Sequence, residues 1–245
     1  MANESVIITG TRFNQEPGVI SSYEHGWQQL WKYFLELFLI TIISWLISIP
    51  TGIPNLWMFG SIYGVLIEGP VAFGVSYANL RAVRGDKLVI EHLFAAFRNY
   101  LNAVLASLLT SIIIVFGLAF LIVPGIIFAC KLAFTPYPVV DRKMEAIEAM
   151  KTSWNMTDGH PLQVFGIGLL AIPICFAGIL LLIVGIIPAI MWINLAFASL
   201  YRSVSIKSDT PGVKIGNRNL EIAKERYVKG EISKEEFEQL KKDLT

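Results

Sequence analysis

Three apolar stretches fill most of this 245-residue chain, and each is interrupted near its middle by an uncharged turn rich in proline and glycine. As a single helix, the second stretch, residues 101–140, would be about 60 Å long at 1.5 Å per residue. That length is roughly twice the hydrocarbon core of a bilayer. The stretch must therefore fold back on itself, and the same reasoning applies to residues 31–80 and 161–202. The pattern predicts three membrane hairpins.

The composition favours a membrane protein over a soluble domain. The chain is 54% hydrophobic and 16% charged, with a mean hydropathy of +0.58, whereas soluble domains carry about 25% charged residues. A formal net charge of +1 gives no reason to expect nucleic acid as a partner. Cys130 and Cys175 both lie in apolar stretches, where we expect small buried hydrophobes rather than a disulfide or a metal pair.

We expect six spans, and two of them are short. The fourth and sixth spans have little length to spare for a hydrocarbon core of ~30 Å, and Phe134-Thr-Pro-Tyr-Pro138 weakens the end of the fourth because proline removes a backbone donor. Two alternatives stay open for these helices. Either they thin the bilayer locally, or some are re-entrant and buried within the protein. The expected spans are 31–50, 56–80, 100–123, 125–141, 162–184 and 186–202.

The distribution of charge orients the hairpins. The turns at 50–54, 124–125 and 185–188 hold no charge, whereas the connections at 81–99 and 141–160 do. Lys and Arg in short loops mark the cytoplasmic side of a membrane. We therefore expect a multi-pass protein of the prokaryotic plasma (inner) membrane with both termini and both long loops cytoplasmic. The basic loop residues are Arg81, Arg84, Lys87, Arg98, Arg142, Lys143 and Lys151.

Three segments outside the spans have the spacing of amphipathic helices. Residues 21–31 and 88–97 separate apolar from polar positions at helical spacing. Such helices either lie at the headgroup level of the membrane or pack on the helix bundle. The clearest stripe recurs at three- and four-residue steps: Met144, Ile147, Met150 and Trp154.

Ionisable side chains inside predicted spans are costly and raise a functional hypothesis by default. Glu68 lies near the middle of the second span and Lys131 lies in the fourth. If the hairpins pack side by side, we expect an intramembrane charge pair between Glu68 and Lys131, which either fixes helix register or lines a polar path. Glu36 lies close enough to the cytoplasmic side to reach headgroup water.

The chain has no recognisable catalytic or cofactor motif. It lacks a nucleophile elbow, a His-Glu-x-x-His helix, a phosphate-binding loop and a dinucleotide fingerprint. His25, His92 and His160 have no partner at metal-ligand spacing. Asp141 and Asp158 flank the second long loop, where we expect them to cap helices. We predict no catalytic residue, no cofactor and no metal.

The composition changes abruptly after Arg202, so we divide the chain into four parts. Residues 1–30 form a cytoplasmic segment with an interfacial helix, 31–203 the transmembrane domain, 204–217 a linker, and 218–245 a charge-rich helical hairpin.

The C-terminal hairpin has its own helix signals. Ser233 and Glu236 fit a capping box, in which each residue satisfies a backbone amide of the other. A hairpin this small cannot bury enough surface to be stable alone, so we expect its apolar face to contact its own copies or another protein. That face consists of Leu220, Ala223, Tyr227, Ile232, Phe237, Leu240 and Leu244.

The same segment carries a specific resemblance. Tyr227, Lys229-Gly230, Ile232-Ser233, Glu235-Glu-Phe237 and Leu244 stand where the short C-terminal domain called SHOCT has equivalent residues. The segment closely resembles that domain. The resemblance implies oligomerisation or protein contact and not catalysis.

Residues 25–203 carry a looser resemblance. It rests on Gly74, Arg84-Gly-Asp86, Leu93-Phe94, Phe97, Val123-Pro-Gly-Ile126, Val139-Val-Asp141, Glu148-Ala-Met150, Ser153, Gly159-His160 and Phe165. Together these resemble the bacterial integral membrane family catalogued as domain of unknown function 975, and the related membrane domain attached to some glycerophosphodiester phosphodiesterases. The resemblance implies a polytopic bundle in a lipid membrane. It implies no assigned reaction, because the phosphodiesterase chemistry resides in a separate barrel domain.

We therefore expect an all-α, polytopic transmembrane helix bundle that is not an enzyme. Its expected role is to organise or scaffold at the membrane, with the lipid bilayer and either its own copies or another protein as partners. No nucleic acid and no small-molecule ligand are indicated. The alternative is a transporter or channel for a small molecule, lipid or ion that uses Glu68 and Lys131.

Overall fold

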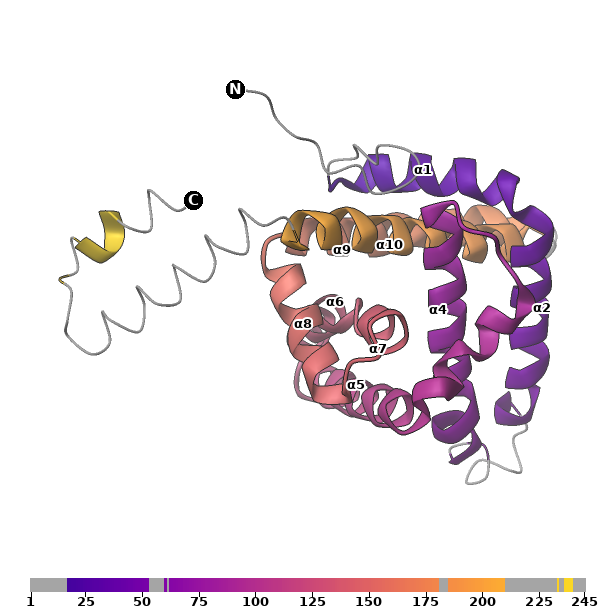
Figure 1. Cartoon of the computed structure of the whole chain (residues 1–245), viewed down its shortest axis with the longest axis horizontal. Helices are drawn as coiled ribbons and strands as arrows, with labels where there is room; N and C mark the ends of the chain where they lie inside the picture. Colours follow the sequence, from indigo (N-terminus) through magenta and orange to yellow (C-terminus); the bar gives the residue numbers. More distant parts are fainter. Residues whose placement is uncertain are drawn as a thin grey trace. The chain divides into compact units, whose positions relative to one another are not determined.

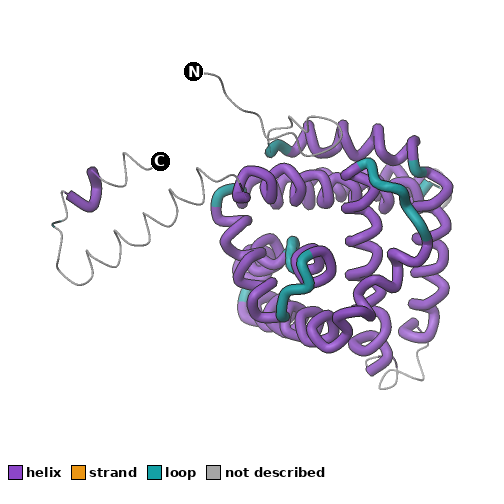
Figure 2. Tube along the Cα trace, viewed as in Figure 1, coloured by secondary structure: helices purple, strands orange, loops and turns teal. Residues whose placement is uncertain are grey.

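The structure is a computed structural model that describes residues 17–52, 60, 62–180, 185–209, 233 and 236–239. Every regular element within these ranges is helical (Figures 1 and 2), which confirms the all-α prediction for the described part of the chain. Contacts divide the chain into two units, Met1–Ser203 and Val204–Thr245. The elements are α1 (Val19–Lys32), α2 (Phe34–Ser48), η1 (Ile49–Gly52), η3 (Gly64–Glu68), α4 (Gly69–Arg84), η4 (Ile90–Asn99), α5 (Tyr100–Phe120), α6 (Ile122–Leu132), α7 (Pro136–Asp141), α8 (Ala146–Asp158), α9 (Pro161–Leu180) and α10 (Ile186–Asp209).

Five described segments are long and apolar enough to cross a membrane. They correspond to every predicted span except the second, 56–80, of which residues 56–59 and 61 lie outside the described residues. The described part of that span includes η3, a π-helical turn that continues directly into α4. The count of six spans therefore stays a prediction. The five segments are Phe34–Thr51, Ile90–Phe120, Ile122–Asp141, Pro161–Leu180 and Ile186–Ile206.

The second hairpin reverses at Leu121 and not at the predicted Pro124–Gly125 turn. Leu121 has an extended backbone (φ −163°, ψ 142°), and Pro124 and Gly125 lie in the first turns of α6. Proline is tolerated at the start of a helix because the first N–H groups have no intrahelical partner. A Cβ on Gly125 would lie 2.5 Å from Cδ2 of Leu118. Gly125 therefore allows α5 and α6 to approach closely.

The fourth predicted span is divided into two helices. α6 ends at Leu132 and α7 begins at Pro136, because proline cannot supply the N–H that would continue the helix. The prediction that this proline-containing segment weakens the end of the span is confirmed. The 11 residues of α6 cover only about 17 Å, roughly half of a hydrocarbon core.

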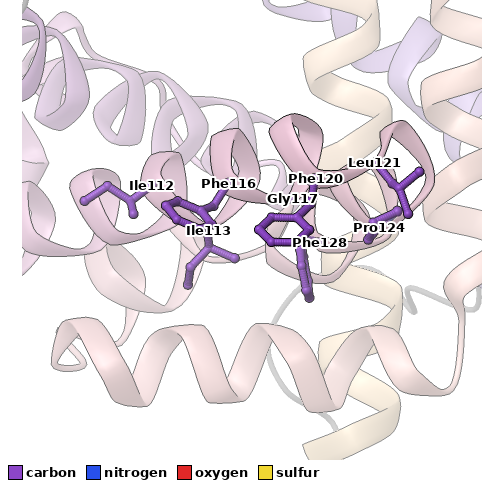
Figure 3. Close-up of a pocket in the computed structure, with 8 residues that line it drawn as sticks. All are labelled: Ile112, Ile113, Phe116, Gly117, Phe120, Leu121, Pro124 and Phe128. Atoms are coloured by element: carbon purple, nitrogen blue, oxygen red, sulfur yellow. The ribbon is translucent and has the colours of Figure 1, made fainter.

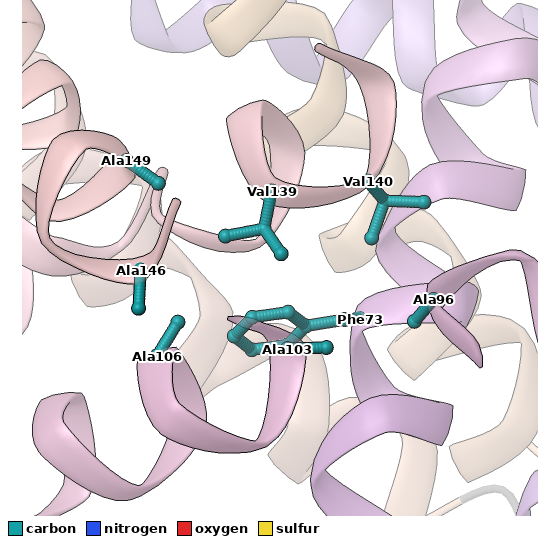
Figure 4. Packing of buried hydrophobic residues seen from close by; sticks show 8 residues of the cluster. All are labelled: Phe73, Ala96, Ala103, Ala106, Val139, Val140, Ala146 and Ala149. Carbon is teal, nitrogen blue, oxygen red and sulfur yellow. The ribbon is translucent and has the colours of Figure 1, made fainter. Parts of the chain in front are cut away.

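Small side chains form the core where α5, α7 and α8 meet (Figure 4). Ala103 and Ala106 of α5 pack in one cluster with Ala146 and Ala149 of α8, and all four are almost completely buried. Small residues let helix axes come close together, which is the usual basis of helix packing in membranes. The other members of the cluster are Phe73, Ala96, Val139 and Val140.

α8 confirms the helix predicted around residues 144–154 and separates its two faces. The face against the bundle is made mostly of small residues, with Ala149 and Ser153 fully buried, and it also includes buried Met156. Within the predicted apolar stripe, Ile147 is 61% and Trp154 37% exposed, whereas Met144 packs against the core cluster. The small-residue face confirms that α8 packs on the bundle, and a position at the headgroup level of the membrane stays a prediction.

The segment predicted as a helix at 88–97 is the 3₁₀ helix η4. It lies directly on α4, because a Cβ placed on Gly74 would be only 1.7 Å from the carbonyl oxygen of Leu93. A 3₁₀ helix is narrower than an α-helix, which suits this backbone-to-backbone contact. It also has three residues per turn, so that residues i and i+3 lie above one another.

α1 confirms the amphipathic helix predicted at residues 21–31. It lies along α9 and α10 and across the direction of α4 (Figure 1). The Tyr23 hydroxyl donates to the Ile167 carbonyl at 2.9 Å, and the Trp192 indole donates to the Tyr23 carbonyl at 2.8 Å. α1 is therefore held to both long helices by hydrogen bonds, of which the one to α9 is buried.

The first residues of the linker predicted at 204–217 are helical, and the division of the chain into four parts stays a prediction. α10 is helical as far as Asp209, and residues 210–217 lie outside the described residues. The predicted boundary lies at the change in composition after Arg202, and the helix continues past that point.

Candidate functional site

An ion pair between Arg84 and Asp141 joins the end of α4 to the end of α7. Both terminal nitrogens of the guanidinium donate to the carboxylate, Nη1 to Oδ1 at 2.5 Å and Nη2 to Oδ2 at 2.6 Å. Burial by itself lowers the pKa of Arg84, but the hydrogen bonds to Asp141 and its negative charge outweigh burial and raise that pKa above its ordinary value. Bidentate pairs of this kind fix orientation as well as charge.

α10 reaches this ion pair through aromatic rings. Tyr201 of α10 stacks on Tyr137 of α7, with ring centroids 4.5 Å apart and an interplanar angle of 13°. Phe134 meets Tyr201 edge-on at 5.6 Å. Arg202 donates a hydrogen bond to the carbonyl of Val83 on α4. α4, α7 and α10 therefore meet at one polar and aromatic junction.

A small polar pocket of about 180 Å³ lies beside the ion pair, lined by α4, η4, α7 and the residue segment after α7. Arg81 of the lining donates to Asp86 at 3.1 Å and lies over the ring of Tyr77, 5.7 Å from its centroid. Sequence reasoning did not group the lining residues, because residues 140–143 of the lining are distant in the chain from the lining residues of α4 and η4. The charged lining residues are Arg81, Glu91, Arg98, Asp141 and Lys143.

Lys131 pairs with Asp158 of α8 and not with Glu68 as predicted. The Lys131 ammonium also lies over the ring of Trp154, 5.3 Å from its centroid. α6 packs against α8, and the Ser153 hydroxyl donates to the Lys131 carbonyl at 2.8 Å. This packing brings the ammonium to the C-terminal end of α8. Asp158, which we predicted to cap a helix, is therefore an ion-pair partner, as Asp141 is for Arg84.

The structure does not bring the two predicted site residues together. Glu68 ends the π-helical segment η3 and takes part in none of the ion pairs found among the described residues. Glu36 lies in the first turn of α2, where a negative charge interacts favourably with the helix N-terminus. Glu36 likewise takes part in none of the ion pairs found in the described part of the chain.

The histidines lie outside any metal-like cluster in the described ranges, where no three His, Cys, Asp or Glu side chains gather to hold an ion. His25 of α1 contacts the Ser199 hydroxyl at 3.2 Å. Burial, assisted by the positive charge of Arg202, lowers the pKa of His25 to about 4, so the ring is neutral at pH 7. His92 lies on the pocket wall.

The capping box predicted in the C-terminal hairpin is confirmed. The Ser233 N–H donates to Oε2 of Glu236 at 2.8 Å, and the Glu236 N–H donates to Oγ of Ser233 at 3.2 Å. Phe237 belongs to the helix that this box opens. The remaining residues of the predicted apolar face lie outside the described residues: Leu220, Ala223, Tyr227, Ile232, Leu240 and Leu244.

Comparison with known families gives two matches. Residues 219–244 match the Short C-terminal domain, SHOCT, which confirms the resemblance seen in the sequence. Residues 63–208 match the domain of unknown function DUF7847, and this range contains the polar pocket and both partners of the Arg84–Asp141 pair. A relationship to domain of unknown function 975 or to the phosphodiesterase membrane domain stays a prediction. Searches among curated proteins and solved structures returned no match. Because the larger match covers more than half of the chain, the protein belongs to the DUF7847 family and carries a SHOCT domain after it.

Proposed function

We propose that this chain is a multi-pass protein of the prokaryotic plasma membrane that acts as a non-enzymatic scaffold and assembles through its C-terminal hairpin. The observation that carries the membrane part is the apolar surface of the long helices. Phe116 and Phe120 of α5 are 67% and 78% exposed, and Leu180 of α9 is 80% exposed. Water does not favour a large contiguous apolar surface, whereas lipid tails are as apolar as these side chains.

An apolar hollow on the α5–α6 hairpin supports the same proposal (Figure 3). It has a volume of about 510 Å³, and its lining residues include no charged side chain. A lipid acyl chain matches this chemistry, because it offers neither donor nor acceptor. The lining residues are Ile112, Ile113, Phe116, Gly117, Phe120, Leu121, Pro124 and Phe128.

The orientation in this proposal comes from the basic residues. Arg81, Arg98 and Lys143 gather at one pocket in the two long connections, while the reversal at Leu121 has no charged neighbour in sequence. Basic residues in short loops favour the cytoplasmic side. In the proposed topology, the polar pocket and both termini are cytoplasmic.

The assembly role is supported by the small size of the hairpin and by its family match. Residues 218–245 cannot bury enough surface to fold alone, yet the capping box at Ser233 defines a helix start within them. The match to SHOCT covers almost the whole segment. We propose that several copies cover their apolar faces together, or that another protein covers this face.

Removal of residues 218–245 tests the assembly. The protein mass is measured by light scattering in detergent micelles, where the full chain of 27.3 kDa should form a multiple and the shortened chain a monomer. Phe237→Glu should also weaken assembly, because it places a charge on the predicted apolar face. Glu238→Ala, a neighbouring exposed position, is the matched control and should leave the mass unchanged. An unchanged mass after the deletion would refute self-assembly through the hairpin.

Transport is the second candidate function, and the geometry lends it less support. It relied on Glu68 and Lys131 as intramembrane charges, whereas Lys131 pairs with Asp158. Flux of a small ion in proteoliposomes that is lost in Lys131→Met, but retained in Lys151→Met, would reverse this ranking. Lys151 is the control because it is an exposed lysine on α8.

A further inference from the structure

η4 sorts its side chains into three rows, because a 3₁₀ helix has three residues per turn. Leu93 and Ala96 form a row with no exposed surface. His92, Ala95 and Arg98 form a second row that lines the polar pocket. The third row begins at Glu91, which lines the pocket, and continues with exposed Phe94 and Phe97 to half-buried Tyr100 at the start of α5. The successive aromatic ring centroids are 6.0 and 5.7 Å apart.

The pocket holds more positive than negative charge. One of its two acids, Asp141, is already engaged by both terminal nitrogens of Arg84. Glu91 is the other acid and takes part in none of the ion pairs among the described residues. Three basic side chains line the pocket: Arg81, Arg98 and Lys143. Arg81 is paired with Asp86, so Arg98 and Lys143 are the bases that outnumber Glu91.

The pocket wall contains hydrogen-bond donors that a ligand acceptor could satisfy. Nε of Arg81 is buried and has no hydrogen-bond partner among the described residues, and a buried N–H left unpaired is unfavourable. Nδ1 of His92 accepts the N–H of Val89 at 3.3 Å. The neutral ring therefore carries its proton on Nε2, which makes that atom a donor.

Lys143 holds a strained backbone at the same pocket. Its φ of 52° is the one positive φ recorded for a non-glycine residue in the described ranges. Glycine is the usual residue in this conformation after a helix, because it has no Cβ to clash. Strained residues cluster at ligand sites, and a lysine here places an ammonium at the pocket where glycine would be more stable.

We propose that this pocket binds a terminal phosphate group. Guanidinium and ammonium groups recognise phosphate oxygens through charge-assisted hydrogen bonds, and the pocket joins two guanidinium groups and one ammonium. A phospholipid headgroup with a terminal phosphate and inorganic phosphate share this chemistry. Exposed Phe94 and Phe97, continued by half-buried Tyr100, suit the lipid source, because aromatic residues gather at membrane interfaces. The lipid source rests on the proposed membrane location, whereas phosphate binding itself does not.

The test uses the full chain in dodecyl maltoside micelles. Phosphatidic acid is titrated into the micelles, and affinity is obtained from the rise in unfolding temperature with ligand concentration. Phosphatidylcholine, whose phosphate is capped by choline, is the lipid control, and inorganic phosphate is titrated separately. The wild type should be stabilised by phosphatidic acid and not by phosphatidylcholine.

Variants of the pocket sharpen the test. Arg98→Gln should weaken binding about tenfold, as expected for the loss of a charge-assisted hydrogen bond. Lys143→Gly should weaken it similarly while the ligand-free protein unfolds at the same or a higher temperature, because glycine relieves the backbone strain. Glu91→Gln should strengthen binding by removing a repulsive charge. Lys87→Gln is the matched control, since Lys87 is an exposed base of the same connection outside the pocket.

The outcomes distinguish a lipid phosphate from free phosphate as the ligand, and they show whether the pocket binds phosphate at all. Stabilisation by phosphatidic acid alone supports the pocket and assigns the lipid source, and stabilisation by inorganic phosphate supports the free-phosphate source. No stabilisation by either probe overturns the proposal. An equal loss of affinity in Lys87→Gln and Arg98→Gln also overturns it, because the effect would then be general charge attraction. None of these readouts depends on the oligomeric mass that tests the scaffold.

Discussion

Replacing Gly74 by alanine should force η4 away from α4. The added Cβ would lie 1.7 Å from the Leu93 carbonyl oxygen and 2.5 Å from its carbonyl carbon. η4 would have to retreat by roughly 1.5 to 2 Å to restore ordinary van der Waals separation. Both clashing groups belong to packed backbone, so no side-chain rotation can relieve the contact.

The magnitude follows from two opposing effects. Overpacking a rigid site costs about 1–3 kcal/mol, and we expect the upper end because Leu93 contributes backbone atoms. Alanine in a helix interior stabilises the folded protein by up to about 1 kcal/mol relative to glycine. The net expectation for Gly74→Ala is a loss of about 2 kcal/mol in the free energy of unfolding. For a protein of this size that corresponds to a fall of roughly 4–8 °C in Tm.

Gly168→Ala is the matched control for Gly74→Ala. Gly168 also lies inside a helix, α9, but a Cβ there would have no neighbouring atom within 4 Å. The same chemical change should therefore stabilise the protein by up to about 1 kcal/mol. Unfolding of both variants is followed by circular dichroism in one detergent. Equal stability of the two variants would refute the close approach of η4 to α4.

Three further predictions address charges and caps. Lowering the pH from 7 to 4.5 should destabilise the wild type by about 2–3 kcal/mol more than His25→Asn, because the pKa of His25 is about 4 in the folded chain and 6.5 when unfolded, so that protons favour the unfolded state. Denaturant unfolding at both pH values measures the difference. Equal pH dependence of the two proteins would contradict the prediction. Arg84→Met should lower the free energy of unfolding by about 2 kcal/mol, because it leaves the part-buried Asp141 without its partner. A double-mutant cycle with Asp141→Asn should show coupling, whereas additive losses would argue against the pair. Ser233→Ala should weaken the helix start by about 1 kcal/mol, seen as several-fold faster amide hydrogen exchange at residues 236–239, and unchanged exchange would count against the capping box.

Local patterns in the sequence predict much of the helical structure. The amphipathic spacing that predicts α1 and α8 extends over several turns, so a single face is defined from nearby residues alone. The capping box at Ser233 is also local, because both of its hydrogen bonds join residues three apart. The hairpin reversal is placed at Pro124 instead of Leu121 because proline marks either a turn or the start of a helix.

The candidate site is not visible in the sequence, because its contacts are not local. Arg84 and Asp141 are 57 residues apart, and Asp141 by itself has the position of a helix cap. In the sequence, Lys131 has the position of an intramembrane charge. In the structure, α6 ends at Leu132 and α8 lies beside Lys131. Pairing depends on which helices pack together, and charge type alone does not determine that.

The two faces of α8 show why hydrophobic spacing must be interpreted differently in this chain. In a soluble protein, the large residues of an amphipathic helix face the core. Here Ala149 and Ser153 face it, while Ile147 and Trp154 point outward. Lipid tails are as apolar as leucine, so in a membrane close packing of small residues holds helices together. This inverted arrangement is expected if the outward face of α8 contacts lipid, and it extends the proposed membrane contact to a helix that its charges alone would leave in the cytoplasm.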